Sequence, residues 1–396
     1  MSAHRLAVRA TSALLSIGAL LAVGSLLAIG SLVGCTANAP ASGPNTDQTQ
    51  SAPPPTASAT SAAGVQPSGE PITIETGLKA PWSMVNLPSG STLISERDTG
   101  IILERLAGGG VRRAGSVRGV IHAGESGLLG LAVQAGSAPK YLYAYLTTAS
   151  DNRVIRMQLT GGPGHYSLGA PANILVGIPK ADFHDGGRIA FGPDGMLYIT
   201  TGDAGAGAAT AQDKNSLGGK ILRVTPAGNV PADNPFPGSL VYSLGHRNVQ
   251  GIAWDSHGTL WASEFGQNTW DELNRITPGG NYGWPVVEGI GHNPAYIDPV
   301  YQWRTDEASP SGIVIIKDTI FMATLRGQRL WVIYPGVGNA PATAVAWYAG
   351  EFGRIRDVIA GHEGTLWMLT NNTDGRGTPQ TGDDRILEVP LVPQTG

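Results

Sequence analysis

The chain has 396 residues, of which 41% are hydrophobic and 14% charged, and its formal net charge at pH 7 is −4. Its 56 glycines and 28 prolines argue against long helices and favour short strands joined by turns. The slightly acidic balance offers no basic surface, so we expect no nucleic acid partner.

The first 35 residues resemble a bacterial lipoprotein signal. Basic residues at Arg5 and Arg9 precede an apolar run over residues 10–33, and Cys35, the only cysteine, follows it. This pattern predicts a signal peptide over residues 1–35, cleaved before Cys35, with a lipid attached to the sulfur of Cys35. The alternative is an uncleaved membrane anchor, because the run approaches the length that spans a bilayer. In either case we expect an exported protein held at the extracytoplasmic face of the cell membrane.

Two further regions follow. Residues 36–70 consist mainly of Ala, Pro, Ser, Thr, Gly and Gln, with almost no large apolar side chain. Such a segment cannot bury enough surface to order itself, which predicts a flexible, disordered tether. From residue 71 to residue 396 the pattern changes to short apolar strands with turns between them, so we expect a single folded domain there.

The folded region repeats one unit, in which two apolar strands joined by a glycine turn are followed by a third strand. The clearest hairpins are residues 87–96, 191–200, 254–263 and 360–369, third strands follow at 154–157, 220–224, 329–333 and 385–389, and weaker copies occupy 128–159 and 312–334. Six units of this kind predict an all-β, six-bladed β-propeller, with its functional groups on loops at one face of the central channel. A β-sandwich or a two-domain β protein competes but does not predict the period, and five or seven blades are the other propeller options.

His184 and Asp203 are the most informative polar pair. They bracket two short strands and each lies beside a glycine turn, so both side chains can reach the same rim of a sheet. A histidine oriented by a carboxylate is a general base at neutral pH. The alternative, from these residues alone, is a surface histidine beside a glycine-rich turn.

The region from Pro81 to Val389 resembles, segment by segment, the soluble pyrroloquinoline quinone-dependent glucose dehydrogenases and aldose sugar dehydrogenases, the glucose/sorbosone dehydrogenase family. The segments that carry the resemblance are Gly127-Leu128-Leu129-Gly130, His184-Asp185-Gly186-Gly187-Arg188, Gly245-His246-Arg247-Asn248-Val249-Gln250-Gly251, Asp271-Glu272-Leu273-Asn274, Gly279-Gly280-Asn281-Tyr282-Gly283-Trp284-Pro285 and Arg354-Ile355-Arg356-Asp357-Val358.

The resemblance implies an enzyme that oxidises an aldose at C1 to the lactone, with hydride passing to the quinone and a calcium ion polarising the quinone carbonyls. It implies three catalytic residues: His184 as the base, Asp203 as the carboxylate that holds its imidazole, and Arg247. The cofactor-binding residues that it implies are Glu125, Arg247, Asn248, Gln250, Arg326, Arg354 and Arg356. The arginines suit the three carboxylates of the quinone, because guanidinium groups form charge-assisted hydrogen bonds with carboxylates. The implied calcium ligands are the backbone carbonyls of Gly266 and Gln267.

Four positions depart from the family pattern. Phe265 and Gln267 stand where the calcium-binding segment of the family has His and Pro, and Glu125 stands where Gln is common. A carboxylate at residue 125 repels an anionic quinone unless calcium or an arginine offsets it. Arg326 replaces a cofactor-binding Lys of some members, which keeps the charge but changes the shape. These departures favour an alternative function, a non-catalytic binding protein of the cell envelope; a calcium-dependent lactonase is a third option.

The remaining motifs bear on partners. No glycine-rich phosphate loop follows a strand and opens a helix, so we expect no nucleotide cofactor. There is no Cys-x-x-Cys-His motif, so electrons from the sugar substrate are expected to pass to a separate acceptor. Asp271 and Glu272 are expected to be solvated or to bind a structural ion. Residues 281–285 are expected to form a packed turn rather than to contact substrate.

Overall fold

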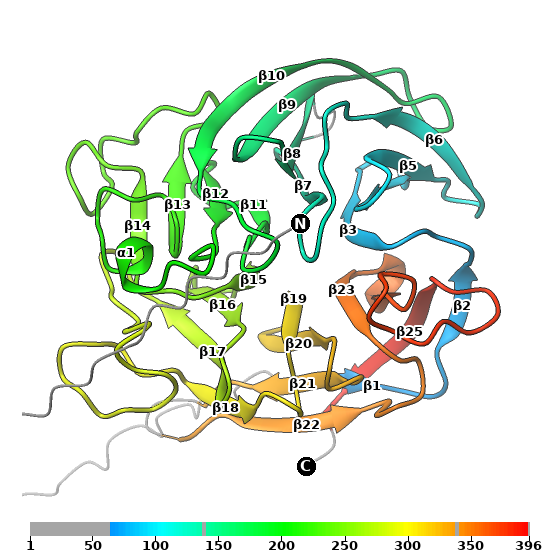
Figure 1. The fold of residues 1–396 in the computed structure, drawn as a ribbon. Coiled ribbons are helices and arrows are strands. Elements are labelled where there is room, and N and C mark those ends of the chain that lie inside the picture. Colours follow the sequence, from blue (N-terminus) through cyan, green and yellow to red (C-terminus); the bar gives the residue numbers. More distant parts are fainter. Residues whose placement is uncertain (1–63, 137–139, 337–339, 395–396) are drawn as a thin grey trace, which may run out of the picture. The chain divides into compact units, whose positions relative to one another are not determined.

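The computed structural model describes residues 64–136, 140–336 and 340–394. Almost all regular structure there is β, and the strands form six antiparallel sheets placed around a common centre (Figure 1). The exceptions are a one-turn helix, α1 (Ala208–Ala211), and a 3₁₀ turn, η1 (His362–Gly364). This confirms the predicted all-β, six-bladed propeller. No helix in the described ranges is long and apolar enough to cross a membrane.

Five of the six sheets are meanders of four consecutive strands, and the sixth combines strands from the two ends of the described chain. The first two sheets are β3 (Pro81–Asn86), β4 (Thr92–Glu96), β5 (Ile101–Arg105) and β6 (Val111–Ser116), and β7 (Leu128–Val133), β8 (Tyr141–Thr147), β9 (Asn152–Thr160) and β10 (Ser167–Ile178). The next two are β11 (Ile189–Phe191), β12 (Leu197–Thr200), β13 (Lys220–Val224) and β14 (Val241–Leu244), and β15 (Val249–Trp254), β16 (Leu260–Glu264), β17 (Trp270–Ile276) and β18 (Tyr301–Arg304). The last two are β19 (Pro310–Ile316), β20 (Thr319–Thr324), β21 (Leu330–Tyr334) and β22 (Thr343–Trp347), and β23 (Ile355–Ala360), β24 (Thr365–Thr370) and β25 (Ile386–Pro393) together with β1 (Val65–Pro67) and β2 (Ile72–Glu75).

The first strand of each sheet faces the centre. Contacts run from β3 to β7, β11, β15, β19 and β23 in turn, and β23 contacts β3 again, so the inner strands form a closed ring. Apolar side chains fill the space between neighbouring sheets. One such cluster joins Trp82 of β3, Leu129 of β7 and Ile189 of β11 with side chains of the outer strands β8 and β13.

The last sheet combines the two ends of the described chain. Strand β1 pairs antiparallel with β25 in the register Val65↔Pro393 and Pro67↔Leu391, and β2 pairs with β25 as well. Val65 is buried in the cluster that contains Val389. The predicted boundary between tether and propeller at residues 70 and 71 is therefore too late, because composition does not reveal that one valine near the end of a polar segment has a sheet to join. Residues 36–63 of the predicted tether, the signal peptide and Cys35 lie outside the described residues.

Candidate functional site

A cavity of about 290 Å³ lies at one end of the central channel. Its lining comprises Glu125, His184, Arg247, Asn248, Gln250, Phe265, Gly266, Gln267, Asp271, Thr305, Ser309, Leu325, Arg326, Arg354, Arg356 and Arg376. These residues come from loops and strand starts between β6 and β25, on five of the six sheets or the connections before them. The structure thus brings together all the predicted site residues in the folded region except Asp203, which lies behind His184; their chemical roles stay predictions.

The imidazole of His184 is held by a buried carboxylate. Nδ1 of His184 lies 2.7 Å from Oδ1 of Asp203, whose exposed fraction is 1%. The other carboxylate oxygen accepts hydrogen bonds from Nε1 of Trp284 at 2.8 Å and from the backbone N–H of Gly207 at 3.2 Å. Burial by itself raises the pKa of Asp203, but hydrogen bonds from His184, Trp284 and Gly205 outweigh it and hold the pKa below its usual value. An ionised Asp203 accepts from Nδ1–H, which leaves Nε2 of His184 as the basic nitrogen.

The backbone explains why these motifs are rich in glycine. His184 has φ of 57°, a left-handed conformation that is uncommon for a residue with a side chain. Its N–H donates to Oε2 of Glu125, and its carbonyl accepts from the N–H of Ala204. A Cβ atom at Gly202 would lie 1.7 Å from that carbonyl oxygen, so only glycine allows the Asp203 strand end to pack against His184.

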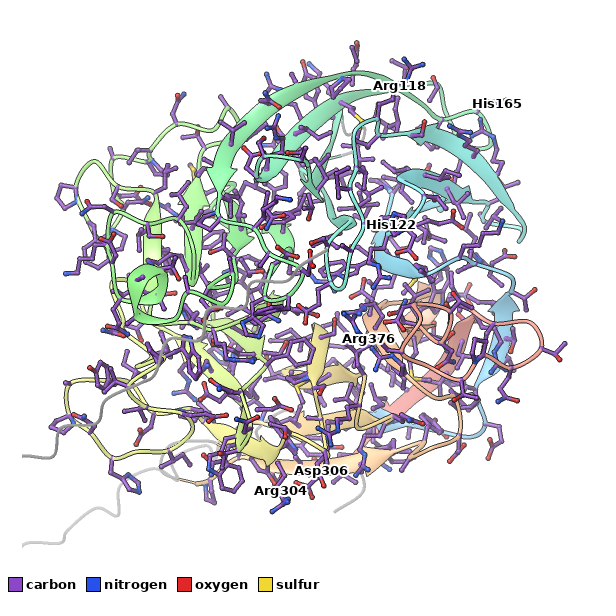
Figure 2. All side chains as sticks on the ribbon, viewed as in Figure 1. Arg118, His122, His165, Arg304, Asp306 and Arg376 are labelled. Carbon is purple, nitrogen blue, oxygen red and sulfur yellow. The ribbon has the colours of Figure 1, made fainter. Side chains whose placement is uncertain are left out.

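An arginine cluster forms the opposite wall. Arg354 donates to Oδ2 of Asp374 at 3.1 Å, and Arg356 and Arg376 lie 3.8 and 3.9 Å from the same oxygen. Burial lowers the pKa of Arg356 to about 9, against the attraction of Asp374. Burial likewise raises the pKa of Asp374, but Arg354 and Arg356 outweigh it and the net shift is downward. Figure 2 shows Arg376 close to the centre of the ring, whereas Arg304 lies at its periphery.

The wall therefore carries more positive charge than its one buried carboxylate neutralises. Five arginines line the cavity, against two lining carboxylates, Glu125 and Asp271. Within the described ranges, Nε of Arg247 and Nε of Arg354 are buried and have no hydrogen-bond partner. Buried donors of this kind normally find an acceptor, so the cavity is suited to an anion.

Glu125 lies among donors. Its Oε2 accepts hydrogen bonds from the N–H of His184 at 3.1 Å, Nδ2 of Asn248 at 3.0 Å and Nε2 of Gln250 at 3.4 Å. The predicted repulsion at this position is thus reduced, because three donors share one carboxylate oxygen. Glu125 also fixes the backbone of His184.

The loop after β16 carries the two predicted calcium ligands. The carbonyl of Gly266 accepts from a terminal nitrogen of Arg247 at 2.6 Å. Oε1 of Glu288 accepts from four consecutive backbone N–H groups, those of residues 267–270, at 2.6 to 3.2 Å. This carboxylate orders a loop in which Gln267 stands where the family has a proline. The sequence offered no signal for it, because Glu288 lies more than fifteen residues beyond the loop.

Asp271 and Glu272 are buried, with exposed fractions of 1% and 8%, so the expectation that they are solvated is wrong. Asp271 accepts from the N–H groups of Gly266 and Ser309, and burial raises its pKa to about 7. Glu272 accepts from the N–H of Gly289, and burial together with the charge of Glu264 raises its pKa. Both carboxylates tie the site loop to its neighbours.

An open cleft adjoins the first cavity. It has a volume of about 880 Å³, and its lining includes Phe183, Asp203, Trp284, Pro285 and Val286. His184, Arg247 and Gln267 line both spaces, so the basic imidazole stands at their junction. Residues 281–285 were expected to form only a packed turn, but Trp284 lines this cleft and donates to Asp203.

Known proteins resemble this chain in sequence and in fold. A solved structure of the PQQ-bound form of an aldose sugar dehydrogenase from Streptomyces coelicolor is 50% identical, has a TM-score of 0.78, and covers 84% of this chain and 99% of that one. Quinoprotein glucose dehydrogenase B of Acinetobacter calcoaceticus is 32% identical over 256 residues, which are 56% of this chain and 54% of that protein. The uncharacterized protein slr1608 of Synechocystis is 30% identical over 78% of this chain and 86% of its own length. Residues 78–379 match the family described as Glucose / Sorbosone dehydrogenase, and because that match spans most of the chain, the protein belongs to this family.

Proposed function

We propose that this protein is a pyrroloquinoline quinone-dependent dehydrogenase that oxidises an aldose at C1 to the lactone and passes the electrons to a separate acceptor. We also propose that it is exported and held at the membrane by a lipid on Cys35, which rests on the N-terminal sequence alone. The observation that carries the catalytic proposal is the His184–Asp203 pair. Asp203 holds Nδ1 of His184, which leaves Nε2 as the basic nitrogen of a residue that lines both the arginine-lined cavity and the open cleft.

The residues of the cavity fit the quinone. A flat tricarboxylate needs cations around its rim, and Arg247, Arg326, Arg354, Arg356 and Arg376 line the space. The unpaired buried Nε atoms of Arg247 and Arg354 are donors that its carboxylates or carbonyls would satisfy. The volume of about 290 Å³ lies near the lower end of the range for small-molecule pockets.

The residues also fit a calcium ion. The carbonyls of Gly266 and Gln267 would hold it, because Ca²⁺ takes backbone oxygen ligands readily. The Gly266 oxygen already accepts from Arg247, but a carbonyl has a second lone pair. When bound, the quinone supplies an electrophilic carbonyl that accepts hydride, and calcium polarises that carbonyl.

The chain itself moves the proton. Nε2 of His184 takes the proton of the C1 hydroxyl, while the hydrogen and electron pair of the C1–H bond leave as hydride and the C1–O bond becomes a carbonyl. Asp203 stabilises the imidazolium that forms and keeps Nε2 directed at the cleft. Arg247 lies between the two spaces, 5.4 Å from the ring centre of Trp284, and its charge favours the developing oxyanion at C1.

The test is reconstitution of the full chain with quinone and calcium, followed by dye reduction with a panel of aldoses. We expect sugar-dependent reduction, its loss in His184→Ala, and unchanged quinone binding in that variant by fluorescence. His257→Ala, an exposed histidine in a turn, is the matched control and should keep full activity.

Two results would contradict the proposal. Absence of both quinone binding and dye reduction would favour a non-catalytic binding protein, for which Glu125 in the cavity is the structural argument. Lactone hydrolysis without quinone would favour a hydrolase on the same scaffold.

A further inference from the structure

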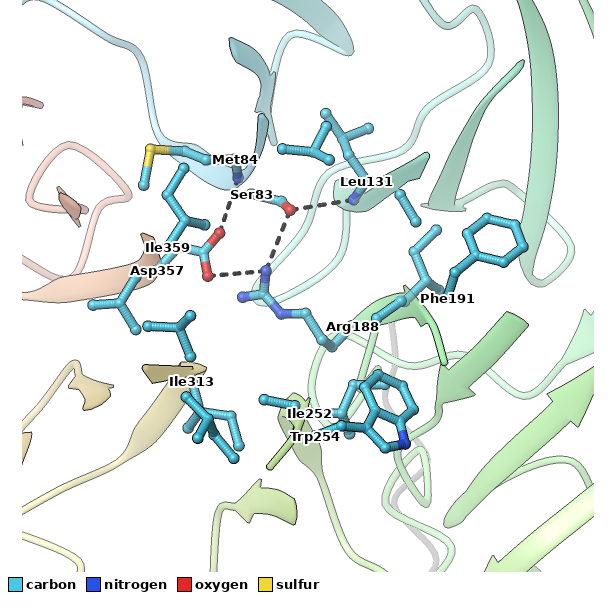
Figure 3. Close-up of a pocket in the computed structure, with 18 of the residues that line it drawn as sticks. Ser83, Met84, Leu131, Arg188, Phe191, Ile252, Trp254, Ile313, Asp357 and Ile359 are labelled. Atoms are coloured by element: carbon cyan, nitrogen blue, oxygen red, sulfur yellow. Dashed lines mark hydrogen bonds and ion pairs between the residues drawn. The ribbon is translucent and has the colours of Figure 1, made fainter. Parts of the chain in front are cut away.

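A separate cavity of about 460 Å³ lies among the inner strands (Figure 3). Residues from all six inner strands line it. On β15, Gln250 lines the first cavity, and Ile252 to Trp254, further along the same strand, line this one. On β23, Arg356 lines the first cavity and Val358, further along, lines this one. The two cavities therefore lie at opposite ends of the ring, and the catalytic proposal makes no use of the second.

The wall of this second cavity is apolar all round. Each inner strand contributes at least one half-buried apolar side chain near its C-terminal end, which also packs against an apolar cluster between the sheets. In chain order these six rim residues are Val85, Val133, Phe191, Trp254, Val314 and Ile359. Together they leave an apolar rim partly exposed around the cavity, and exposed apolar surface gathered in one place is a common feature of binding sites. Its volume lies within the range of pockets that hold a drug-sized molecule.

The floor is polar but electrically balanced. Arg188 and Asp357 are the only charged residues in the lining, and they form an ion pair at 3.1 Å. Arg188 also donates to the hydroxyl of Ser83 and the carbonyl of Gln250. Gly312 makes this pair possible, since a Cβ atom there would lie 2.0 Å from Oδ1 of Asp357.

One donor on the floor lacks an acceptor. The terminal nitrogen NH2 of Arg188 has no hydrogen-bond partner within the described ranges, although the residue is only 7% exposed. Figure 3 shows the guanidinium in the middle of the apolar circle. A buried guanidinium in this state calls for one more oxygen acceptor. Because Asp357 already balances the charge, a neutral acceptor suits this position better than an anion does.

We propose that this second cavity binds a neutral, apolar small molecule that carries a carbonyl oxygen at one end. The apolar body contacts the six rim residues, and the carbonyl oxygen accepts from Arg188. The site is distinct from the quinone cavity, because the linings of the two spaces share no residue.

The probe for the test is Prodan, an uncharged naphthalene with a propionyl group whose emission shifts to the blue in apolar surroundings. We expect saturable binding of one molecule per chain and a blue shift. Val314→Asp should weaken binding at least about tenfold, because a bound apolar molecule would desolvate the new carboxylate. Val345→Asp is the matched control, since Val345 is an exposed valine on β22 of the same sheet, and it should leave the affinity unchanged.

Three results would overturn the proposal: no saturable blue shift, equal affinities in the two variants, or displacement of Prodan by excess quinone, which would place the dye in the first cavity. Val345→Asp should melt close to the parent protein, and Val314→Asp should melt lower but remain folded, because Val314 packs against an apolar cluster. If Val314→Asp unfolds, Ile359→Asp repeats the test on a different inner strand. The comparison of rim and control variants remains decisive even if the protein does not bind quinone.

Discussion

Replacing Asp203 by Asn tests the proposed base most directly. Each carboxylate oxygen now accepts from two groups: Oδ1 from His184 and Gly205, and Oδ2 from Trp284 and Gly207. An asparagine has one acceptor oxygen and one NH2 group. The indole N–H of Trp284 can only donate, so we expect the amide oxygen to turn toward it and the NH2 group toward His184. Nδ1 of His184 then becomes the acceptor, the proton moves to Nε2, and the imidazole can no longer take a proton from substrate.

The size of the effect follows from the step that is lost. General-base catalysis contributes about 10²- to 10⁴-fold, or roughly 3 to 5 kcal/mol of barrier. We expect kcat for dye-linked sugar oxidation to fall by that factor. Quinone affinity should be nearly unchanged, because Asp203 does not line the quinone cavity. Asp213→Asn, at an exposed turn, is the matched control. A kcat within about threefold of the parent would refute the assignment of His184 as a base oriented by Asp203.

Two further predictions concern the side chains that hold the site in place. Glu288→Ala removes the acceptor for the N–H groups of residues 267–270. We expect terbium luminescence to show about 10- to 100-fold weaker cation binding in this variant, and no change in the exposed control Glu351→Ala. An unchanged affinity in Glu288→Ala would show that the loop holds its shape without the carboxylate. Asp374→Asn leaves Arg354 and its neighbours without their counter-charge, and we expect about 3 to 5 kcal/mol lower stability by urea denaturation at neutral pH. Because the pKa of Asp374 is lowered in the fold, its contribution is present above the usual carboxyl pKa and is lost as the pH falls through the folded value, so parent and variant should converge in acid; a constant difference down to low pH would contradict this.

Much of the fold could be predicted, because each repeat unit depends on residues that are close together in the sequence. A glycine turn between two apolar strands favours a hairpin through residues close together in sequence, and β11 and β12 lie where the hairpin 191–200 is predicted. The register at Val65 could not be predicted, since it depends on β25, more than three hundred residues away. Composition described that segment correctly as polar and short of apolar side chains, yet one strand there joins a sheet.

The residues of the site likewise fall into two groups, those that the sequence predicts and those that it does not. His184, Arg247 and Arg354 belong to motifs that can be recognised in the sequence, and the structure brings them to one cavity. Asp374 and Glu288 belong to none, because their role is to neutralise or to orient other groups across loops. Such partners are fixed by tertiary packing alone, so a sequence read segment by segment shows them only as ordinary surface acids.

The pairing of β1 with β25 has a consequence for how the molecule is made. Sheets made of consecutive strands can assemble one after another as the chain is synthesised, but β1 is made early and has to wait for β25, which is made more than three hundred residues later. Residues of the arginine-lined cavity are spread from Glu125 to Arg376, so a chain short of its last sheet lacks three of the five lining arginines, Arg354, Arg356 and Arg376. Activity on refolding should therefore rise together with the slow, long-range docking of the two ends, and not with the earlier formation of individual hairpins.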